Sequence, residues 1–184
     1  GSTPKGWVKF YEERPWIAGG FMWTGFDYRG EPNPFYYSNV ASSFGPIDLC
    51  GMEKPPFYYY KSWWTDERFV KLAPHWNYRE GEVAKITAYT NCDLVTLYLN
   101  GEKIGEQTVE KYGKAVFEIP FLAGSLVAVA KKDGKEYRDE LISAGKIAGV
   151  RCAAVLCAEN DSDIGIIQLE GVDADGNVQY TASN

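Results

Sequence analysis

Residues 15–34 of this chain read PWIAGGFMWTGFDYRGEPNP. The first half of the stretch, residues 17–24, is apolar and uncharged and lacks a helical period, which predicts a strand buried on both faces. The second half is rich in glycine and proline, which end strands, so it predicts a loop. If the strand is parallel, Trp23 and Asp27 lie near its carboxyl end, where barrels and open α/β sheets place ligand sites. The stretch is therefore a candidate edge of a binding site.

A helix is predicted on each side of this stretch. Residues 3–13 carry apolar side chains three and four positions apart, which is typical of a helix with one face turned inward. Residues 54–66 begin beside two prolines, which a helix tolerates in its first turn, and Phe57, Tyr60 and Trp64 then line one face with Tyr59 and Trp63 beside it. The second helix must bury its aromatic rings. Together with the strand and the loop before it, it makes one βα unit.

Beyond residue 69 the chain changes to short strands of alternating polarity. Of the 28 aromatic residues, 21 precede residue 79, and all six tryptophans are among them. Asn100-Gly101 and Asp133-Gly134 supply the residue types that two-residue type I′ hairpins require. Six or seven such strands in about 75 residues predict an antiparallel β-sandwich of immunoglobulin-like type. The fold class is therefore mainly β.

Four ordered motifs carry a resemblance to a known family. They are ERPW with GGFMWTGFDYRGEP at residues 13–32, SFGPIDLCG at 43–51, YYYKSWW at 58–64 and PHWNY at 74–78. In this order they resemble the C-terminal portion of glycoside hydrolase family 2 β-galactosidases. The resemblance implies the last strand and helix of a truncated TIM barrel, followed by the sandwich domain.

The resemblance also implies roles for residues near the end of the predicted strand. In that family the tryptophan that matches Trp23 forms the floor of the subsite for a galactose-like ring, and an indole stacks well on the apolar face of a sugar. The alternative is that Trp23 belongs to the core. Asp27 either accepts hydrogen bonds from sugar hydroxyls or anchors the loop, and Glu31 either contacts substrate or fixes a turn.

Catalytic residues are not expected in this chain. A retaining glycosidase needs two carboxyl groups about 5–5.5 Å apart, and in the resembled family both are glutamates on earlier barrel strands. Neither matching motif is present, and neither Glu12-Glu13 nor Asp27 with Glu31 is a credible substitute. We therefore expect this polypeptide alone to be inactive. The longer parent is expected to be a retaining glycosidase that acts on a β-galactoside or a related oligosaccharide.

Composition narrows the classes of partner. The net charge of -6 argues against nucleic acid, and no apolar run reaches the roughly 18 residues needed to span a bilayer. Nothing in the sequence calls for a cofactor. The sequence does not determine the cellular compartment, and a periplasmic or secreted parent protein is compatible with it.

Metal binding is not expected either. His75 is the only histidine, and the four cysteines lack the paired spacings of zinc sites. Small buried thiols are the simpler interpretation, and Cys152 and Cys157 lie too far apart along a strand to form a disulfide. Residues 173–177 contain part of a calcium-loop pattern without its later glutamate, which favours a turn.

Three segments are predicted. Residues 1–68 form the remnant of the catalytic barrel, 69–145 form the sandwich, and 146–184 either add strands to it or begin a further β-sandwich module. The alternative function is a non-catalytic carbohydrate-binding or structural module. Because a barrel strand without its neighbours exposes both faces and both edges, residues 17–24 are also expected to pack on the sandwich or to mediate self-association.

Overall fold

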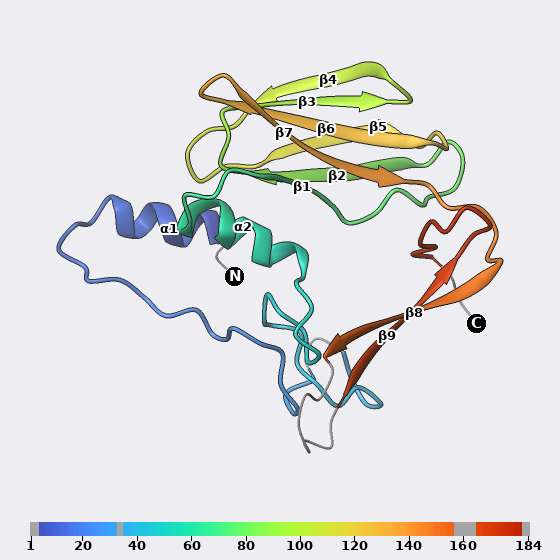
Figure 1. The fold of residues 1–184 in the computed structure, drawn as a ribbon. Helices are drawn as coiled ribbons and strands as arrows, with labels where there is room; N and C mark the ends of the chain where they lie inside the picture. The colour runs from blue at the N-terminus through green and yellow to red at the C-terminus, as the bar shows by residue number, and fades with distance from the viewer. Residues whose placement is uncertain (1–3, 33–34, 157–164, 182–184) are drawn as a thin grey trace.

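The structure is a computed structural model that describes residues 4–32, 35–156 and 165–181. Figure 1 shows an antiparallel β-sandwich with two helices beside it and a separate hairpin that extends away from it. Within the described residues the elements are α1 (Pro4–Glu12), α2 (Pro55–Trp64), β1 (Val70–Ala73), β2 (Val83–Thr90), β3 (Leu94–Leu99), β4 (Glu102–Thr108), β5 (Ala115–Pro120), β6 (Ser125–Lys132), β7 (Lys135–Ile142), β8 (Gly149–Leu156) and β9 (Ile166–Val172). The predictions of a mainly β chain and of an antiparallel sandwich are confirmed.

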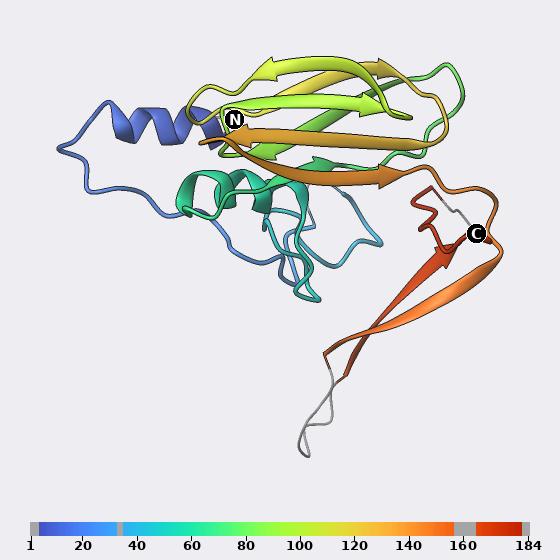
Figure 2. The ribbon, with the colours of Figure 1, turned by 45° about the horizontal axis from the view of Figure 1, so that its top comes forward.

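The sandwich consists of two facing antiparallel sheets. One sheet has the strand order β1-β2-β5 and the other has the order β4-β3-β6-β7. Figure 2 shows the same molecule tilted so that the top of Figure 1 comes forward, with the strands of the sandwich above α2. Alternate residues of both sheets point into one core, in which Trp76, Leu72, Ile86, Leu97 and Leu126 are the largest fully buried side chains. Burial of this apolar surface is the main source of stability for the fold.

The two predicted hairpin turns are formed. Asn100 and Gly101 join β3 to β4 with φ values of 51° and 87°, and Asp133 and Gly134 join β6 to β7 with φ values of 51° and 73°. Two consecutive residues in the left-handed region are what a type I′ turn requires. This turn chemistry therefore explains where these strand pairs reverse direction.

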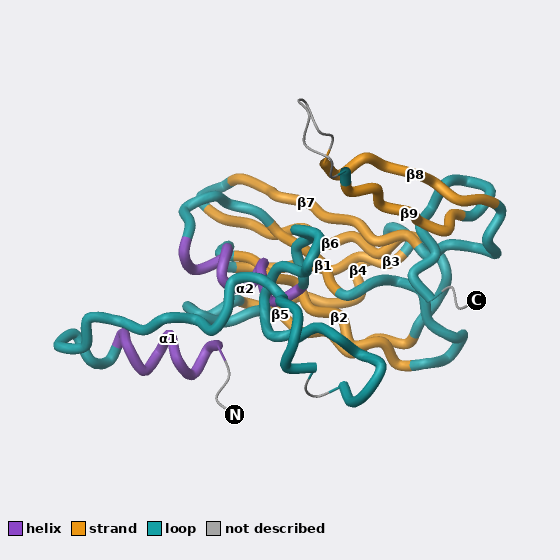
Figure 3. Tube along the Cα trace, turned by 90° about the horizontal axis from the view of Figure 1, so that it is seen from below, coloured by secondary structure: helices purple, strands orange, loops and turns teal. Residues whose placement is uncertain are grey.

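Helix α2 covers the outer side of the three-stranded sheet, as seen from below in Figure 3. Tyr59 packs with Ala73 of β1 and Tyr89 of β2, and its hydroxyl donates a hydrogen bond to the carbonyl of Tyr112 at 3.1 Å. The helix is confirmed, but its buried side is centred on Tyr59, and Trp64 does not belong to it. Tyr59 and Ser62 are the buried residues of the helix, whereas Trp64 is 63% exposed. The side with Tyr59 is buried because it faces β1 and β2 of the three-stranded sheet.

The predicted strand at residues 17–24 is not formed. The segment runs as an extended connection away from α1, and Phe21 and Trp23 are exposed rather than buried. A strand exists only through hydrogen bonds to a neighbour, and no described residue provides one here. Helix α1 is confirmed, although it has no buried residue and therefore lacks the inward face expected for residues 3–13.

Residues 25–32 and 35–53 form a loop, in line with the loop predicted after residue 24. Isolated β-bridges join Phe26 to Ile47, Arg29 to Ala41 and Ile47 to Glu53. The loop leads directly into α2. The loop therefore connects the segment that carries Trp23 to α2.

The last strands form a hairpin of their own. β8 and β9 pair with each other, and neither is hydrogen-bonded to a sheet of the sandwich. Cys152 lies exposed on β8, whereas Cys157 lies outside the described residues, so their predicted separation is not described. Neither α1 nor α2, the helices of the described residues, has the length and apolar character needed to span a bilayer.

Candidate functional site: an aromatic cleft beside Trp23

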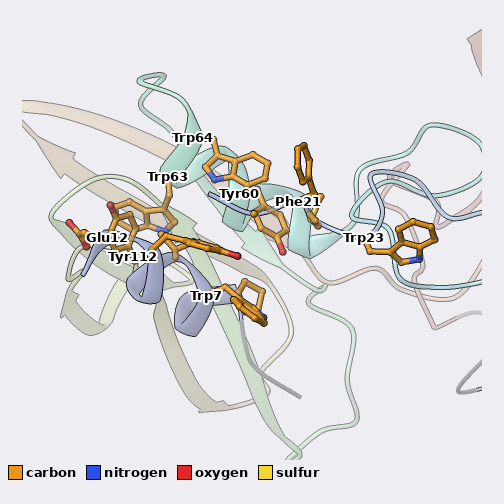
Figure 4. A pocket seen from close by; sticks show the side chains of 13 residues that line it. Trp7, Glu12, Phe21, Trp23, Tyr60, Trp63, Trp64 and Tyr112 are labelled. Carbon is orange, nitrogen blue, oxygen red and sulfur yellow. The ribbon is translucent and has the colours of Figure 1, made fainter. Parts of the chain in front are cut away.

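A cleft of about 750 Å³ lies between α1, α2 and the extended segment. This volume falls within the range of small-molecule sites, about 300–1,000 Å³. Figure 4 shows that aromatic rings from four parts of the chain border it. The lining residues include Trp7 and Tyr11 of α1, Phe21 and Trp23 of the segment, Tyr60, Trp63 and Trp64 of α2, and Tyr112 of the loop before β5.

Trp23 lies at one end of the cleft and presents its indole to solvent. The residue is 77% exposed, and its Nε1–H donates a hydrogen bond of 3.3 Å to the hydroxyl of Tyr28. That hydroxyl in turn donates to the carboxylate of Glu31, and this bond raises the pKa of Tyr28, partly offset by the bond from Trp23. The indole edge is thus held in place while its face stays accessible. The alternative assignment of Trp23 to the core is wrong for this chain.

Asp27 is held by a dense set of contacts within the loop. Its carboxylate accepts hydrogen bonds from the Lys54 ammonium at 2.9 and 2.8 Å and from the backbone N–H of Gly45 at 2.8 Å. A Cβ at Gly45 would lie 2.3 Å from the backbone carbon of Phe26, so only glycine allows this close approach. The structure therefore gives Asp27 the anchoring contacts that were one of its two predicted roles.

The structure does not bring Trp23 and Asp27 into one cavity. Trp23 lines the aromatic cleft, whereas Asp27 lines a separate, open hollow of about 660 Å³ with residues of the loop that follows it. Both residues were expected near the carboxyl end of one strand, but that strand is not formed, and the chain bends at Gly25 to form the bridged loop that holds Asp27. Contact of either residue with a sugar remains a prediction.

Gly20 lies against the Tyr11 ring of α1 at the border of the cleft. A Cβ at Gly20 would lie 2.0 Å from the Tyr11 hydroxyl, so a larger residue would require this ring to shift. Across the cleft, Trp63 and Tyr112 meet edge to face at 5.4 Å, and the Trp63 Nε1–H is buried without a hydrogen-bond partner. Lys111, beside Tyr112, forms an ion pair with Glu12 of α1.

The carboxylates near the cleft are already engaged. Glu12 pairs with Lys111, Glu13 with Arg14 at 3.4 Å and Asp27 with Lys54. Among the described residues, no group of three or more histidine, cysteine or acidic side chains could hold a metal ion.

His75 has a structural environment. Its ring stacks on Tyr78 at 4.8 Å and on Tyr180 at 5.8 Å, and Nδ1 accepts the backbone N–H of Asn77. Burial lowers the pKa of His75, opposed by the negative charge of Glu82. His75 therefore packs between Tyr78 of the sandwich and Tyr180 near the end of the described chain.

The predicted turn at residues 173–177 is formed. The Asp173 carboxylate accepts hydrogen bonds from the backbone N–H groups of Gly145, Asp175 and Asn177. These bonds hold the pKa of Asp173 down at about 2, opposed by its partial desolvation. The carboxylate thus ties the C-terminal turn to the end of the sandwich.

Several cleft residues were not singled out in the sequence. Trp7 and Trp63 were read only as helix residues, and Tyr112 lies in a loop whose position depends on the sandwich. The one available signal was the concentration of tryptophan before residue 79. It marks an aromatic-rich region but does not indicate which rings meet.

Comparison with known proteins shows which proteins this chain resembles in sequence. Residues 81–138 match a family described as "Domain of unknown function (DUF4982)". The whole chain is 33% identical to Beta-galactosidase BoGH2A of Bacteroides ovatus, and it covers 22% of that protein.

Two solved structures share the fold. A β-glycosidase from Bacteroides vulgatus aligns with a TM-score of 0.83 and 30% identity, over 96% of this chain and 23% of that one. A glycosyl hydrolase family 2 member from Bacteroides cellulosilyticus aligns with a TM-score of 0.79 and 28% identity, over 95% of this chain and 28% of that one. The chain thus spans about a quarter of the length of these relatives, and it corresponds to the C-terminal portion of glycoside hydrolase family 2 enzymes.

Proposed function

We propose that this chain is a non-catalytic C-terminal portion of a retaining, β-galactosidase-like glycosidase. In the longer enzyme, Trp23 would provide an indole surface for the sugar ring, and the catalytic carboxylates would come from preceding barrel strands. Residues 1–68 would then complete the barrel, with the sandwich of residues 69–145 behind it. The similarity to a β-galactosidase along the whole chain supports this assignment.

The observation that carries the proposal is the contrast between Trp23 and the acidic side chains. The indole is exposed beside a cleft, as a sugar-stacking platform must be. The acidic side chains Glu12, Glu13 and Asp27 are paired with Lys111, Arg14 and Lys54. Of these pairs, that of Asp27 is largely withdrawn from water, so freeing Asp27 for catalysis would leave the Lys54 charge without compensation.

A hydrolysis assay tests the proposal. The purified 184-residue chain is incubated with nitrophenyl β-galactoside and β-glucuronide, with a full-length family 2 β-galactosidase as the positive control. We expect no release of nitrophenol above the buffer blank. Turnover that persists through repurification and is lost in Asp27→Asn or Glu12→Gln would show that this chain has its own catalytic carboxylates, and the proposal would be wrong.

A carbohydrate-binding role without catalysis is the second candidate, and the aromatic cleft favours it. Sugars bind to exposed rings through their apolar faces, and Trp7, Trp23 and Trp64 all border the cleft with at least 49% of their surface exposed. A titration with neutral galacto-oligosaccharides followed by tryptophan fluorescence separates the candidates. A binding module gives a saturable change that Trp23→Ala removes, whereas an incomplete active site gives a weak and non-saturating response.

A further inference from the structure

The hydroxyl of Tyr28 joins two groups that each allow a single direction of hydrogen bonding. The Trp23 indole N–H can only donate, and it donates to this hydroxyl at 3.3 Å. The Glu31 carboxylate can only accept, and it accepts from the same hydroxyl. That bond raises the pKa of Tyr28 above its ordinary value of 10.0, so the hydroxyl keeps its proton at neutral pH. These two bonds form a Trp23–Tyr28–Glu31 relay.

Tyr28 is itself held by the loop on which it lies. Its backbone N–H donates to the Ser42 hydroxyl at 3.1 Å, and its carbonyl accepts the Ser42 N–H at 2.8 Å. Ser42 is 4% exposed, so water competes little for these bonds. The Tyr28 ring also contacts those of Trp23 and Phe44, with centroid distances of 6.4 and 6.3 Å. Tyr28 therefore gives the Trp23 indole a fixed neighbour.

Glu31 reaches Tyr28 through an uncommon backbone conformation. Gly30 and Glu31 have φ values of 94° and 44°, and the Gly30 N–H donates to the carbonyl of Val40 at 2.9 Å. Glycine adopts a positive φ readily, but other residues rarely do. Residues held in this way cluster at functional sites. The side chain that this turn presents is the carboxylate that accepts from the Tyr28 hydroxyl.

We propose that Tyr28 and Glu31 are positioning residues that fix the Trp23 indole and so set the face that it offers to a sugar. The relay holds the polar edge of the indole, and the residue remains 77% exposed for stacking. A ring that is held in advance loses less conformational freedom when a ligand binds. The use of this face by a sugar rests on the proposed function, whereas the fixed indole does not.

The test follows the Trp23 indole N–H by NMR in the 184-residue chain, with its signal assigned by its loss in Trp23→Phe. Tyr28→Phe removes both bonds and keeps the ring, so the indole proton should exchange with solvent about 2- to 10-fold faster. The heteronuclear NOE of the indole should fall as well, because the ring gains fast motion. Tyr37→Phe, which alters a fully exposed ring of the same loop, is the matched control and should change neither quantity.

Two variants test the second bond of the relay. Glu31→Ala leaves the Tyr28 hydroxyl without its acceptor, and it should speed exchange of the Trp23 indole proton less than Tyr28→Phe does. Glu31→Gln retains an oxygen that can accept from the hydroxyl, so it should restore most of the wild-type behaviour. Equal indole exchange in Glu31→Ala and the wild type would remove Glu31 from the relay and overturn its assigned role.

Backbone amides separate positioning from a general loosening of the loop. The amides of Asp27 and Ser42 bond to Ile47 and Tyr28, and both should keep their wild-type exchange in Tyr28→Phe. Unchanged exchange and NOE of the indole in Tyr28→Phe would overturn the proposal. Faster exchange at these two amides would also overturn it, because Tyr28 would then hold the whole loop and not the indole in particular.

A titration with neutral galacto-oligosaccharides, followed on the same signal, distinguishes this proposal from the proposed function. The Trp23 signal should shift with sugar in the wild type and should shift less in Tyr28→Phe at the same concentration. Equal shifts in both would overturn the positioning role. A wild-type signal that does not shift, together with faster indole exchange in Tyr28→Phe, would contradict Trp23 as a sugar platform and would support the relay alone.

Discussion

At the scale of single residues, a shielded ion pair holds the loop that follows Trp23. The side chain of Asp27 is 9% exposed and that of Lys54 is 26% exposed, and their charged groups lie 2.8 Å apart. The pair joins the start of the loop to the residue before α2. Because both charges are largely withdrawn from water, removing one leaves the other without compensation.

Asp27→Asn is expected to loosen this loop. Loss of a charged hydrogen-bond acceptor should destabilise it by about 1–3 kcal/mol. The amides of Asp27 and Lys54, which bond to Ile47 and Pro46, should then exchange with solvent about 5- to 150-fold faster by NMR or mass spectrometry. Glu118→Gln is the control, since its pair with Lys85 is mostly exposed and worth about 1 kcal/mol at most. Equal exchange in Asp27→Asn and the wild type would show that the pair does not hold the loop.

Asp173 predicts an acid sensitivity at the C-terminal turn. Its pKa is about 2 in the folded chain against an ordinary value of 3.8, so its contribution to stability is fully present above pH 3.8 and is lost as the pH falls toward 2. Carboxyl chemical shifts from NMR should place its titration well below 3.8. Asp173→Asn should remove the pH dependence of the protection factor of the Gly145 amide, its exchange rate relative to the unprotected chain at the same pH, between pH 2 and 4. A midpoint near 3.8 would mean that the backbone bonds to this carboxylate are not kept in solution.

At the scale of elements, α2 belongs physically to the sandwich. Its short apolar face is buried on β1 and β2, and the Tyr59 hydroxyl reaches the loop before β5. An isolated helix of ten residues is marginal in water, so this packing accounts for most of its stability. The helix therefore stabilises the sheet and positions one wall of the aromatic cleft.

Tyr59→Ala is expected to destabilise the sandwich by about 3–5 kcal/mol, because it removes a buried ring and leaves a cavity against Ala73 and Tyr89. Tyr59→Phe keeps the ring and should cost only about 0.5–1.5 kcal/mol for the lost hydrogen bond. Urea denaturation followed by circular dichroism measures both. Trp64→Ala, at an exposed position of the same helix, should change the free energy of unfolding by about 0.5 kcal/mol or less. A small effect of Tyr59→Ala would show that α2 is not docked on the sheet.

At the scale of the whole molecule, stability is unevenly distributed. The sandwich has the large core, whereas the exposed aromatic rings concentrate at residues 16–64 and the hairpin of β8 and β9 presents Val150, Ile167 and Leu169 to solvent. A two-stranded hairpin alone is marginally stable in water. The parts outside the sandwich therefore depend on further contacts, which fits a chain that spans only part of its relatives.

This distribution predicts where the chain can be cut. A fragment of residues 54–145 should unfold cooperatively with the urea midpoint of the sandwich in the full chain, because it keeps α2 on the sheet. A fragment of residues 69–145 loses that cover over Tyr89 and Ala73 and should have a lower midpoint. Equal midpoints for the two fragments would place the boundary of the folding unit after α2 instead of before it.

The sequence alone determined the local features of this protein. Alternating residues and the Asn-Gly and Asp-Gly pairs indicated the sandwich and its hairpins, since a pleated strand and a type I′ turn depend on residues close in the chain. Four motifs indicated the family. The buried face of α2, the cleft and the separation of Trp23 from Asp27 were decided by tertiary structure. Each of these depends on which distant surface lies opposite, and no strand among the described residues pairs with residues 18–24, because a strand requires a partner that its own sequence cannot supply.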